Sequence, residues 1–306
     1  MTSLDPAPPS PEPASPDPTQ SAGGPGIDAR DVRRVFRGGL GWRARTALDG
    51  VDLTVARGRT LGLFGANGSG KTTLLRILAG VDRPTRGTVR VLGRAPTDRE
   101  VRARVAYLPD ASPFPEELSA PAVLDLVGAL GGLRRRERRE RAAALLERVG
   151  LADARRAPLR TFSRGMHRRF GFAHAFLTDP EVVLLDEPTA GLDAPGFDVL
   201  AELLSSARAR GATIVLASHV ASDLIDRCDE LLLLRAGHVE QHGTPDELLG
   251  VEGELELRVR AGERTDAADL LAAGGLDVVE QRRARRPLVD LYRSTRGLLG
   301  SKDVEP

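Results

Sequence analysis

Residues 65–73 read Gly-Ala-Asn-Gly-Ser-Gly-Lys-Thr-Thr, and this stretch decides the fold. Its three glycines let the backbone bend tightly and point N–H groups toward an anion. Lys71 follows with a compact positive charge, and Thr72 with a hydroxyl suited to a divalent cation. The stretch therefore predicts a loop that binds the phosphates of a nucleotide.

The segments on either side of the loop have the patterns that this interpretation requires. Residues 60–64 are a short apolar run typical of a buried strand, and residues 74–79 continue at helical spacing to a stop at Gly80. The phosphates would then lie at a helix N-terminus, which favours anions. The residues expected to contact the nucleotide here are Gly65, Asn67, Gly68, Ser69, Gly70, Lys71, Thr72 and Thr73.

Lysine usage supports the same interpretation. The chain has 44 Lys plus Arg, yet only two of these are lysines, Lys71 and Lys302. A compact ammonium fits among phosphate oxygens where a planar guanidinium does not. The alternative, a glycine-rich turn that arose by chance, does not explain why strand, loop, Lys-Thr pair and helix occur together.

Length and composition limit the class of protein. The 306 residues suffice for one large domain with a small extension, and a net charge of +1 gives no broad basic field for nucleic acid. No apolar run approaches the roughly 20 residues that span a bilayer, and the N-terminus lacks the pattern of a signal peptide. The single Cys228 excludes an internal disulfide. We expect a cytoplasmic protein that reaches a membrane only through a partner.

Composition divides the chain into three parts. Residues 1–26 hold eight prolines among small and polar residues, which predicts a disordered tail. Residues 27–249 are globular, and residues 250–306 restart the pattern as a small α+β accessory region. The elements expected in this last part are a strand at 254–260, a helix at 266–273 and a short helix beginning near 288–292.

Strand-like and helix-like stretches alternate through the globular part. We predict strands at 27–36, 47–56, 60–64, 87–92, 103–108, 181–186, 212–217 and 231–240. We predict helices at 71–79, 117–130, 134–149, 164–178, 195–210 and 220–227. The alternation indicates an α/β domain with a largely parallel sheet, interrupted by an inserted helical subdomain at about 111–178.

Two carboxylates end the apolar strand that begins at Val182. Ligands of parallel sheets bind at the carboxyl ends of the strands, so Asp186 and Glu187 should face the phosphates. Asp186 would hold Mg²⁺ through water, and Glu187 would polarise the water that attacks the γ-phosphorus. An ordinary strand end with capping acids is the alternative, and the phosphate loop upstream argues against it.

Two further polar residues are candidates for the same site as Asp186 and Glu187. His219 ends another apolar strand, from which it could reach the γ-phosphate, whereas a lone strand-end histidine is more often structural. Ser163 precedes a helix, where its hydroxyl and the N–H of Gly165 would form a second anion-binding helix start.

Together these elements resemble the ATP-binding subunits of ABC transporters over about residues 27–245. The matching motifs are Walker A at 65–72, the signature loop at Ser163, Arg164, Gly165 and Met166, Walker B at 182–187, the D-loop at 190–193 with Asp193, and the switch histidine His219. The resemblance implies a P-loop NTPase fold of the ABC ATPase type. It also implies ATP and Mg²⁺ as cofactors, with Glu187 and His219 as the catalytic residues.

The resemblance implies partners as well. Each ATP would lie between the phosphate loop of one protomer and the signature loop of another, in a homodimer or heterodimer. ATP hydrolysis would power a separately encoded transmembrane permease at the inner face of the cell membrane, with no nucleic acid involved. The signature, with Arg164 and Met166 where glycine and glutamine are commoner, is similar to the export branch of the family. A soluble ABC ATPase of cofactor assembly or another non-transport process is the alternative.

Phe36 matches the family pattern, whereas Asp110 departs from it. Phe36 stands where the family has an aromatic residue that stacks on adenine, and we favour stacking over a role in the core. Asp110 replaces the family's usual glutamine; a carboxylate can bind Mg²⁺ through water but cannot donate a hydrogen bond as an amide does. The expected Mg²⁺ ligands are Thr72, Asp110 and Asp186.

Overall fold

The largest sheet of the structure has six strands. The structure is a computed structural model and describes residues 24–37, 44–111, 114–219, 225–260 and 277–285. The strands of this sheet, in spatial order, are β5 (Val105–Leu108), β6 (Val182–Asp186), β7 (Thr213–Ser218), β3 (Thr60–Phe64), β8 (Glu230–Arg235) and β9 (His238–Gly243). All neighbours are parallel except β8 and β9.

Two apolar cores lie on opposite faces of this sheet. Along β6, Val182 and Leu184 belong to one core, and Val183 and Leu185 belong to the other, because successive strand residues point to opposite faces. The first core includes helix α1 (Lys71–Leu78), and the second includes the apolar sides of α5 (Arg164–Phe176) and α6 (Ala194–Ala209). Burial on both faces explains why the central strands are continuous apolar runs.

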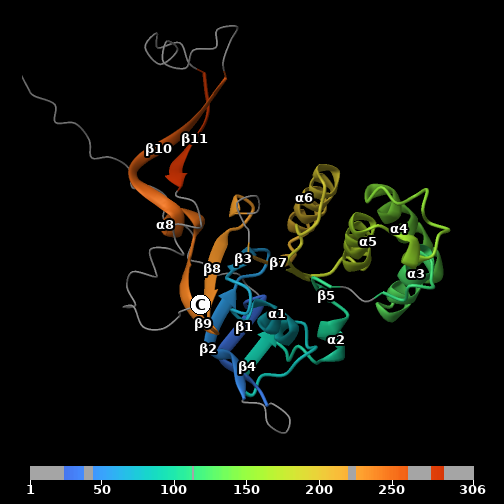
Figure 1. Ribbon diagram of the computed structural model, residues 1–306, viewed down its shortest axis with the longest axis horizontal. Helices are drawn as coiled ribbons and strands as arrows, with labels where there is room; N and C mark the ends of the chain where they lie inside the picture. Colours follow the sequence, from blue (N-terminus) through green and yellow to red (C-terminus); the bar gives the residue numbers. More distant parts are fainter. Residues whose placement is uncertain (1–23, 38–43, 112–113, 220–224, 261–276, 286–306) are drawn as a thin grey trace, which may run out of the picture.

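Three strands that the sequence places in the α/β alternation form a separate antiparallel sheet. They are β1 (Ile27–Phe36), β2 (Arg45–Val55) and β4 (Arg86–Val91), in the order β2-β1-β4. This corrects the expectation of one largely parallel sheet. The sequence predicts no helix between β1 and β2, and consecutive strands joined without a helical crossover pair as antiparallel neighbours. Helix α1 packs between the two sheets, and its leucines share a core with both (Figure 1).

The predicted strand at 231–240 is wrong as one element, since the chain turns back within it. Ala236 and Gly237 lie between β8 and β9 with φ of 46° and 85°, and two successive residues with positive φ are typical of a tight hairpin turn. The prediction missed the turn because alanine rarely takes that conformation. The one-turn helix α2 (Arg99–Arg102), capped by Asp98, was also not predicted.

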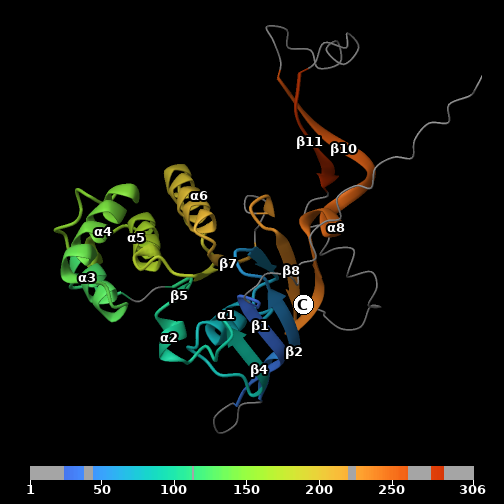
Figure 2. The same ribbon diagram turned by 180° about the vertical axis from the view of Figure 1, so that it is seen from behind.

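Helices α3 (Ala120–Leu130), α4 (Arg135–Arg148) and α5 group at one side of the six-stranded sheet (Figures 1 and 2). A short 3-10 turn at Leu159–Thr161 precedes α5. Buried residues of the three helices, including Leu124, Leu146 and Phe170, continue the second core outward. α5 thus connects the helical group to the strand β6 that follows it.

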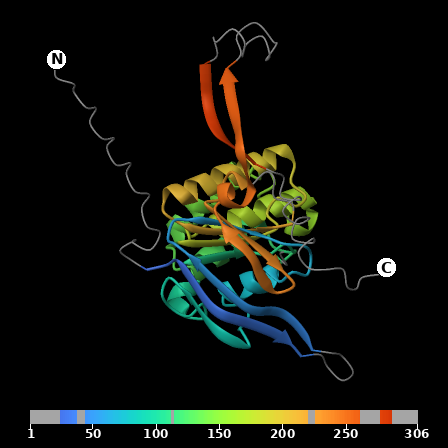
Figure 3. The same cartoon turned by 90° about the vertical axis from the view of Figure 1, so that its left-hand side faces the viewer.

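The chain beyond the main sheet projects from the body (Figure 3). Helix α8 (Pro245–Leu249) begins with a capping box between Thr244 and Glu247. Strands β10 (Gly250–Arg260) and β11 (Asp277–Arg285) then pair antiparallel, and β11 was not predicted. The expected helices at 266–273 and near 288 lie outside the described residues, as do 1–23 of the proline-rich tail and 220–224 of the predicted helix 220–227. No helix within the described ranges has both the length and the apolar character of a membrane span.

Candidate functional site

The carboxyl ends of three neighbouring strands meet at one edge of the six-stranded sheet. The ladder pairs Phe64 at the end of β3 with Ser218 at the end of β7, and Asp186 at the end of β6 with Ala217 of β7. The 65–70 loop follows the first of these strands. The topology therefore brings the predicted phosphate loop, the carboxylates and His219 to the same edge.

The glycines of the loop are required by its shape. Gly68 and Gly70 have φ of 80° and 115°, a region that side chains with a Cβ rarely enter. A Cβ on Gly70 would lie 2.6 Å from the Ala47 carbonyl oxygen, and one on Gly65 would lie 2.4 Å from that of Leu234. Helix α1 starts directly after Gly70, with no side-chain cap and no acid in its first turn. Its first N–H groups are thus directed toward the space above the loop.

Lys71 folds back over this loop. Its side chain is 6% exposed, and Nζ donates to the carbonyl oxygens of Gly65 at 2.7 Å and Ala66 at 3.3 Å. The same Nζ lies 3.6 Å from Oε1 of Glu187. The ammonium therefore stands between the loop and the strand-end carboxylates, where a phosphate group would need a positive charge.

Asp186 and Thr72 form a pair of oxygen donors under the loop. Thr72 Oγ1 donates to Asp186 Oδ2 at 2.6 Å, while Asp186 Oδ1 is buried and has no hydrogen-bond partner among the described residues. Burial raises the pKa of Asp186, and the hydrogen bond from Thr72 acts in the opposite direction. A buried, unpartnered carboxylate oxygen beside a hydroxyl fits a hard cation such as Mg²⁺.

Glu187 combines an unusual backbone with a well-held carboxylate. Its φ is 46°, a left-handed conformation that is costly for a residue with a side chain and is enriched at functional sites. Its Oε2 accepts hydrogen bonds from Ser218 Oγ and the His219 N–H, each at 3.2 Å, and lies 2.8 Å from His219 Nδ1. The structure thus brings the two predicted catalytic residues into direct contact.

A cavity of about 280 Å³ joins these groups to the antiparallel sheet. Its walls are formed by Phe36, Arg45, Ala47, Asn67, Gly68, Gly70, Lys71, Thr72, Thr73, Asp110 and Glu187. Phe36 is 39% exposed, which excludes the core role, and Arg34 stacks over its ring with the guanidinium carbon 4.5 Å from the ring centroid. Arg45 was not predicted; it starts β2, and only the separate sheet places it beside the loop.

Asp110 also faces this cavity, but the structure does not join it to a metal cluster. Its charge helps to raise the pKa of Asp186, behind burial and the charge of Glu187. No set of three or more His, Cys, Asp or Glu converges on one point within the described ranges. The oxygen atoms in direct contact are those of Thr72 and Asp186, and Asp110 acts on this pair through its charge.

Ser163 and Arg164 are exposed at the start of α5, whereas Gly165 is half-buried and Met166 packs against the second core. Ser163 caps the helix, with Oγ accepting from the Met166 N–H at 3.2 Å. The Arg164 side chain is exposed and makes no hydrogen bond or ion pair with another described residue, and a Cβ on Gly165 would meet open space. Asp193 has a structural contact of its own, since its Oδ1 caps α6 by accepting from Gly196 N at 3.0 Å.

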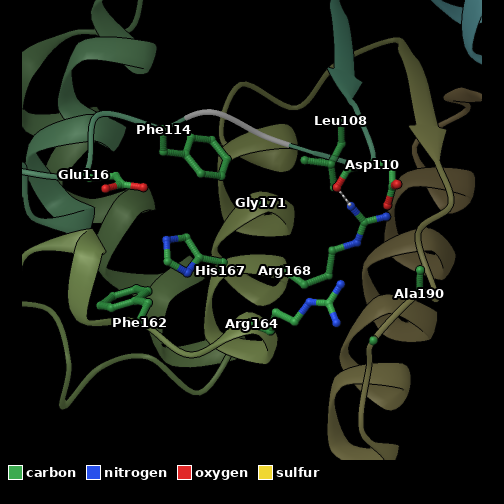
Figure 4. A pocket seen from close by; sticks show the side chains of 11 residues that line it. Leu108, Asp110, Phe114, Glu116, Phe162, Arg164, His167, Arg168, Gly171 and Ala190 are labelled. Atoms are coloured by element: carbon green, nitrogen blue, oxygen red, sulfur yellow. Dashed lines mark hydrogen bonds between the residues drawn. The ribbon is translucent and has the colours of Figure 1, made fainter.

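Arg168 is a residue that the sequence reasoning missed. It is 8% exposed, and it lines a second cavity of about 420 Å³ between α5, Asp110 and the Ala190–Gly191 segment (Figure 4). Burial lowers the pKa of its guanidinium. The available signal was its register: Arg168 falls on the same face of α5 as Phe172 and Ala175, where a cation needs hydrogen-bond partners.

A glycine-rich loop at a helix start, with carboxylates at the end of a nearby strand of the same sheet, is typical of the P-loop nucleoside triphosphatases. The ABC transporter family model matches residues 48–190. The chain is 37% identical over 261 residues to the daunorubicin resistance ATP-binding protein DrrA3 of Streptomyces coeruleorubidus, covering 83% of each protein. It is 33% identical over 281 residues to Nod factor export ATP-binding protein I of Ralstonia nicotianae, covering 89% of this chain and 88% of that one. The chain thus belongs to the ATP-binding proteins of ABC transporters and is an ATPase.

Solved structures agree with this assignment. An ATP-binding subunit of an ABC transporter superposes with a TM-score of 0.69 at 27% identity, over 88% of this chain and 98% of that one. A bacterial ABC transporter cassette solved as a dimer superposes with a TM-score of 0.65 at 25% identity, over 71% of this chain and 98% of that one. The predicted fold class, a P-loop NTPase of the ABC ATPase type, is therefore confirmed.

Proposed function

We propose that this ATPase powers export through a separately encoded transmembrane permease at the inner face of the cell membrane. The relatives named for daunorubicin resistance and for Nod factor export support the direction. The observation that carries ATP turnover is the placement of Glu187, whose carboxylate is held by His219 and lies 3.6 Å from the Lys71 ammonium.

In this proposal each group in the cavity has one role. The N–H groups of the 65–70 loop and Lys71 bind the β- and γ-phosphates, and the Phe36 ring stacks on adenine. Thr72 and Asp186 hold Mg²⁺, with Asp110 acting through water. When bound, the cation would offset negative charge on the phosphates.

Glu187 would then orient and polarise the attacking water. Its Oε2 is already engaged by Ser218 and His219, whereas Oε1 has no neighbour closer than the Lys71 ammonium among its described polar contacts. Oε1 is therefore the oxygen that can accept a proton from water next to the γ-phosphate. His219 would fix the carboxylate and lie near the same phosphate.

We further propose that two ATPase chains share each ATP head to tail. The phosphate loop surrounds one side of a nucleotide, while Ser163, Arg164 and Gly165 face outward from the same chain. A helix start of this kind attracts the anion of a second chain. The solved dimer of a cassette that is 25% identical supports this arrangement.

The test is ATP turnover by the purified chain with and without Glu187→Gln. Turnover should fall roughly 10³-fold, because the general base is lost, while ATP affinity is retained and an ATP-locked dimer accumulates in size-exclusion chromatography. The matched control is Glu181→Gln, at the opposite end of the same strand, which should leave turnover unchanged. Equal turnover in Glu187→Gln and the unmodified chain would remove Glu187 from its proposed role.

The transport role needs a separate measurement. The gene next to this one, or a protein that co-purifies from membranes, should be a permease, and reconstituting the two in vesicles should raise ATP turnover. If turnover occurs but no membrane subunit co-purifies or stimulates it, the alternative of a non-transport ABC ATPase gains support.

A further inference from the structure

Arg168 donates hydrogen bonds to the backbone of two separate loops. Nη1 donates to the carbonyl oxygens of Pro109 at 3.2 Å and Asp110 at 3.1 Å, both just after β5. Nη2 donates to that of Asp186 at 2.7 Å and to that of Glu187, and Nε donates to that of Pro188 at 3.2 Å, all at the end of β6. One guanidinium thus holds the carboxyl ends of two neighbouring strands together.

These contacts use the shape of arginine. A guanidinium has donors in a rigid planar fork, and only such a fork can reach both loops at once. The side chain is buried and its partners are all carbonyl oxygens. A buried cation is costly without full hydrogen bonding, so the loops and the side chain hold one another in a single arrangement.

The position of Arg168 on α5 connects its hydrogen bonds with the two loops to the signature loop. Ser163 caps α5 and Arg164 is its first residue, so Arg168 lies one turn further along the same helix. A shift of the α5 start would move the guanidinium, and with it the backbone that carries the Glu187 carboxylate. A displacement of about 1 Å at a reacting group can cost roughly 10²-fold in rate.

We propose that Arg168 is a positioning residue that transmits the engagement of the signature loop to the catalytic loops of the same chain. The inference rests on the proposed shared-ATP function. It assigns a second role to α5, since the helix presents Ser163 to a partner's ATP and also sets, through Arg168, the position of Glu187 beside its own ATP.

The next residue provides a matched control. The Arg169 guanidinium donates to the carbonyl oxygens of Val149 at 3.0 Å and Gly150 at 3.4 Å, inside the helical group. Arg169 has the same chemistry, the same helix and the same kind of acceptor, but no contact with the nucleotide site. Replacing each arginine with methionine therefore separates a general loss of packing from the proposed role.

The first experiment measures hydrogen–deuterium exchange in the nucleotide-free chain. Arg168→Met should speed exchange in peptides covering 105–111 and 184–190, whereas Arg169→Met should speed it at 147–152 only. This readout does not depend on ATPase activity, so it stands even if the proposed function fails. Unchanged exchange at both 105–111 and 184–190 in Arg168→Met would overturn the inference.

The second experiment measures turnover in the same variants, with melting temperature recorded for each. Arg168→Met should lower kcat roughly 10²-fold with KM changed less than about 3-fold, and Arg168→Lys should not restore kcat, because an ammonium lacks the fork. Arg169→Met should keep kcat within about 3-fold. Full kcat in Arg168→Lys, or equal losses in the two methionine variants, would contradict the proposal.

A double-mutant cycle tests the transmission itself. Ser163→Ala should lower kcat less in the Arg168→Met chain than in the unmodified chain, because coupled residues are not additive. The corresponding cycle with Arg169→Met should be additive. Additivity in both cycles would overturn transmission from the signature loop. An unmodified chain without turnover would instead count against the proposed function.

Discussion

The phosphate loop and the signature loop are both glycine-containing helix starts, yet they differ in how far each is complete within one chain. Around the loop at 65–70, Lys71 is buried, its ammonium is held by two carbonyls, and a strand-end carboxylate lies 3.6 Å away. At Ser163 the cap is made, but Arg164 is exposed and has no partner among the described residues. Neither helix has an acid in its first turn.

This difference indicates that the phosphate loop can bind a nucleotide within one chain, whereas the signature loop needs a second chain. The phosphate loop lines a cavity together with an aromatic ring, cationic side chains and carboxylates of the same chain. The signature loop offers a positive helix end and an exposed guanidinium to something outside the chain. We therefore expect damage at the phosphate loop to weaken ATP binding as well as turnover, and damage at the signature loop to lower turnover while binding survives.

The largest effect is expected from Lys71→Ala. Removing the ammonium leaves the phosphate charge without its nearest cation, so turnover should fall roughly 10³-fold and ATP binding should weaken. Titration with a fluorescent ATP analogue and a phosphate-release assay measure the two quantities. Full activity in this variant would be incompatible with the phosphate-loop assignment.

A somewhat smaller effect is expected from Ser163→Asp. Aspartate caps a helix as well as serine does, so α5 should remain folded, but its charge would face the partner's ATP. Turnover should fall roughly 10²-fold, with ATP binding by the phosphate loop changed less than about 3-fold. Ser163→Thr, which keeps the hydroxyl and the cap, is the control.

Mixing these two damaged chains sharpens the comparison further. In a head-to-tail pair of Lys71→Ala with Ser163→Asp, one of the two sites contains an intact phosphate loop and an intact signature loop. Turnover in the mixture should therefore rise well above that of either variant alone. A mixture that stays inactive would argue against a site shared between two copies of this chain.

A smaller change is expected at Asp110. If its carboxylate supports Mg²⁺ through water, Asp110→Ala should raise the Mg²⁺ concentration for half-maximal ATP turnover, by roughly 10-fold. Asp110→Asn keeps an oxygen but removes the charge. Its Mg²⁺ requirement should lie between those of the unmodified chain and Asp110→Ala. An unchanged Mg²⁺ requirement would leave Thr72 and Asp186 as the direct ligands and exclude Asp110.

The smallest effect is expected from Glu181→Gln, because Glu181 lies next to the amino end of β6, away from the carboxylates at the carboxyl end of that strand. The hydrogen bond from Arg104 lowers the pKa of Glu181, so the pair stabilises the fold above the carboxyl's unfolded-state pKa, and this contribution is lost as pH falls through the lowered pKa. Both side chains are over 40% exposed, so the loss at neutral pH should be about 0.5 kcal/mol. At pH 7 the melting temperature of Glu181→Gln should be slightly below that of the unmodified chain. At acid pH the two melting temperatures should become equal.

Much of the site could be predicted because its residues follow one another along the chain. The loop, Lys71 and Thr72 are contiguous, and Asp186, Glu187 and His219 each end a recognisable apolar strand, so topology alone brings them together. The contact between Glu187 and His219 follows from adjacent strands whose ends are level.

Other features depend on contacts that leave no local pattern. A strand pattern does not say which sheet the strand joins, so the separate β2-β1-β4 sheet and the place of Arg45 beside the loop could not be predicted. The Ala236–Gly237 turn was missed because alanine is an unusual residue at positive φ. The register of Arg168 on α5 indicates that it is buried, but its acceptors are backbone carbonyls, which no side-chain motif marks.

The separate antiparallel sheet has a further consequence. Phe36 belongs to that sheet and the phosphate loop belongs to the other, and no strand-to-strand hydrogen bonding joins the two among the described residues. A nucleotide whose base meets Phe36 and whose phosphates meet the loop would bridge the junction between the sheets, which the shared core around α1 and the hydrogen bond from the Asp49 N–H to the Gly237 carbonyl oxygen also hold. Its ribose would lie between the two sheets, and the bound ligand would add a further link between sheets that share no strand ladder.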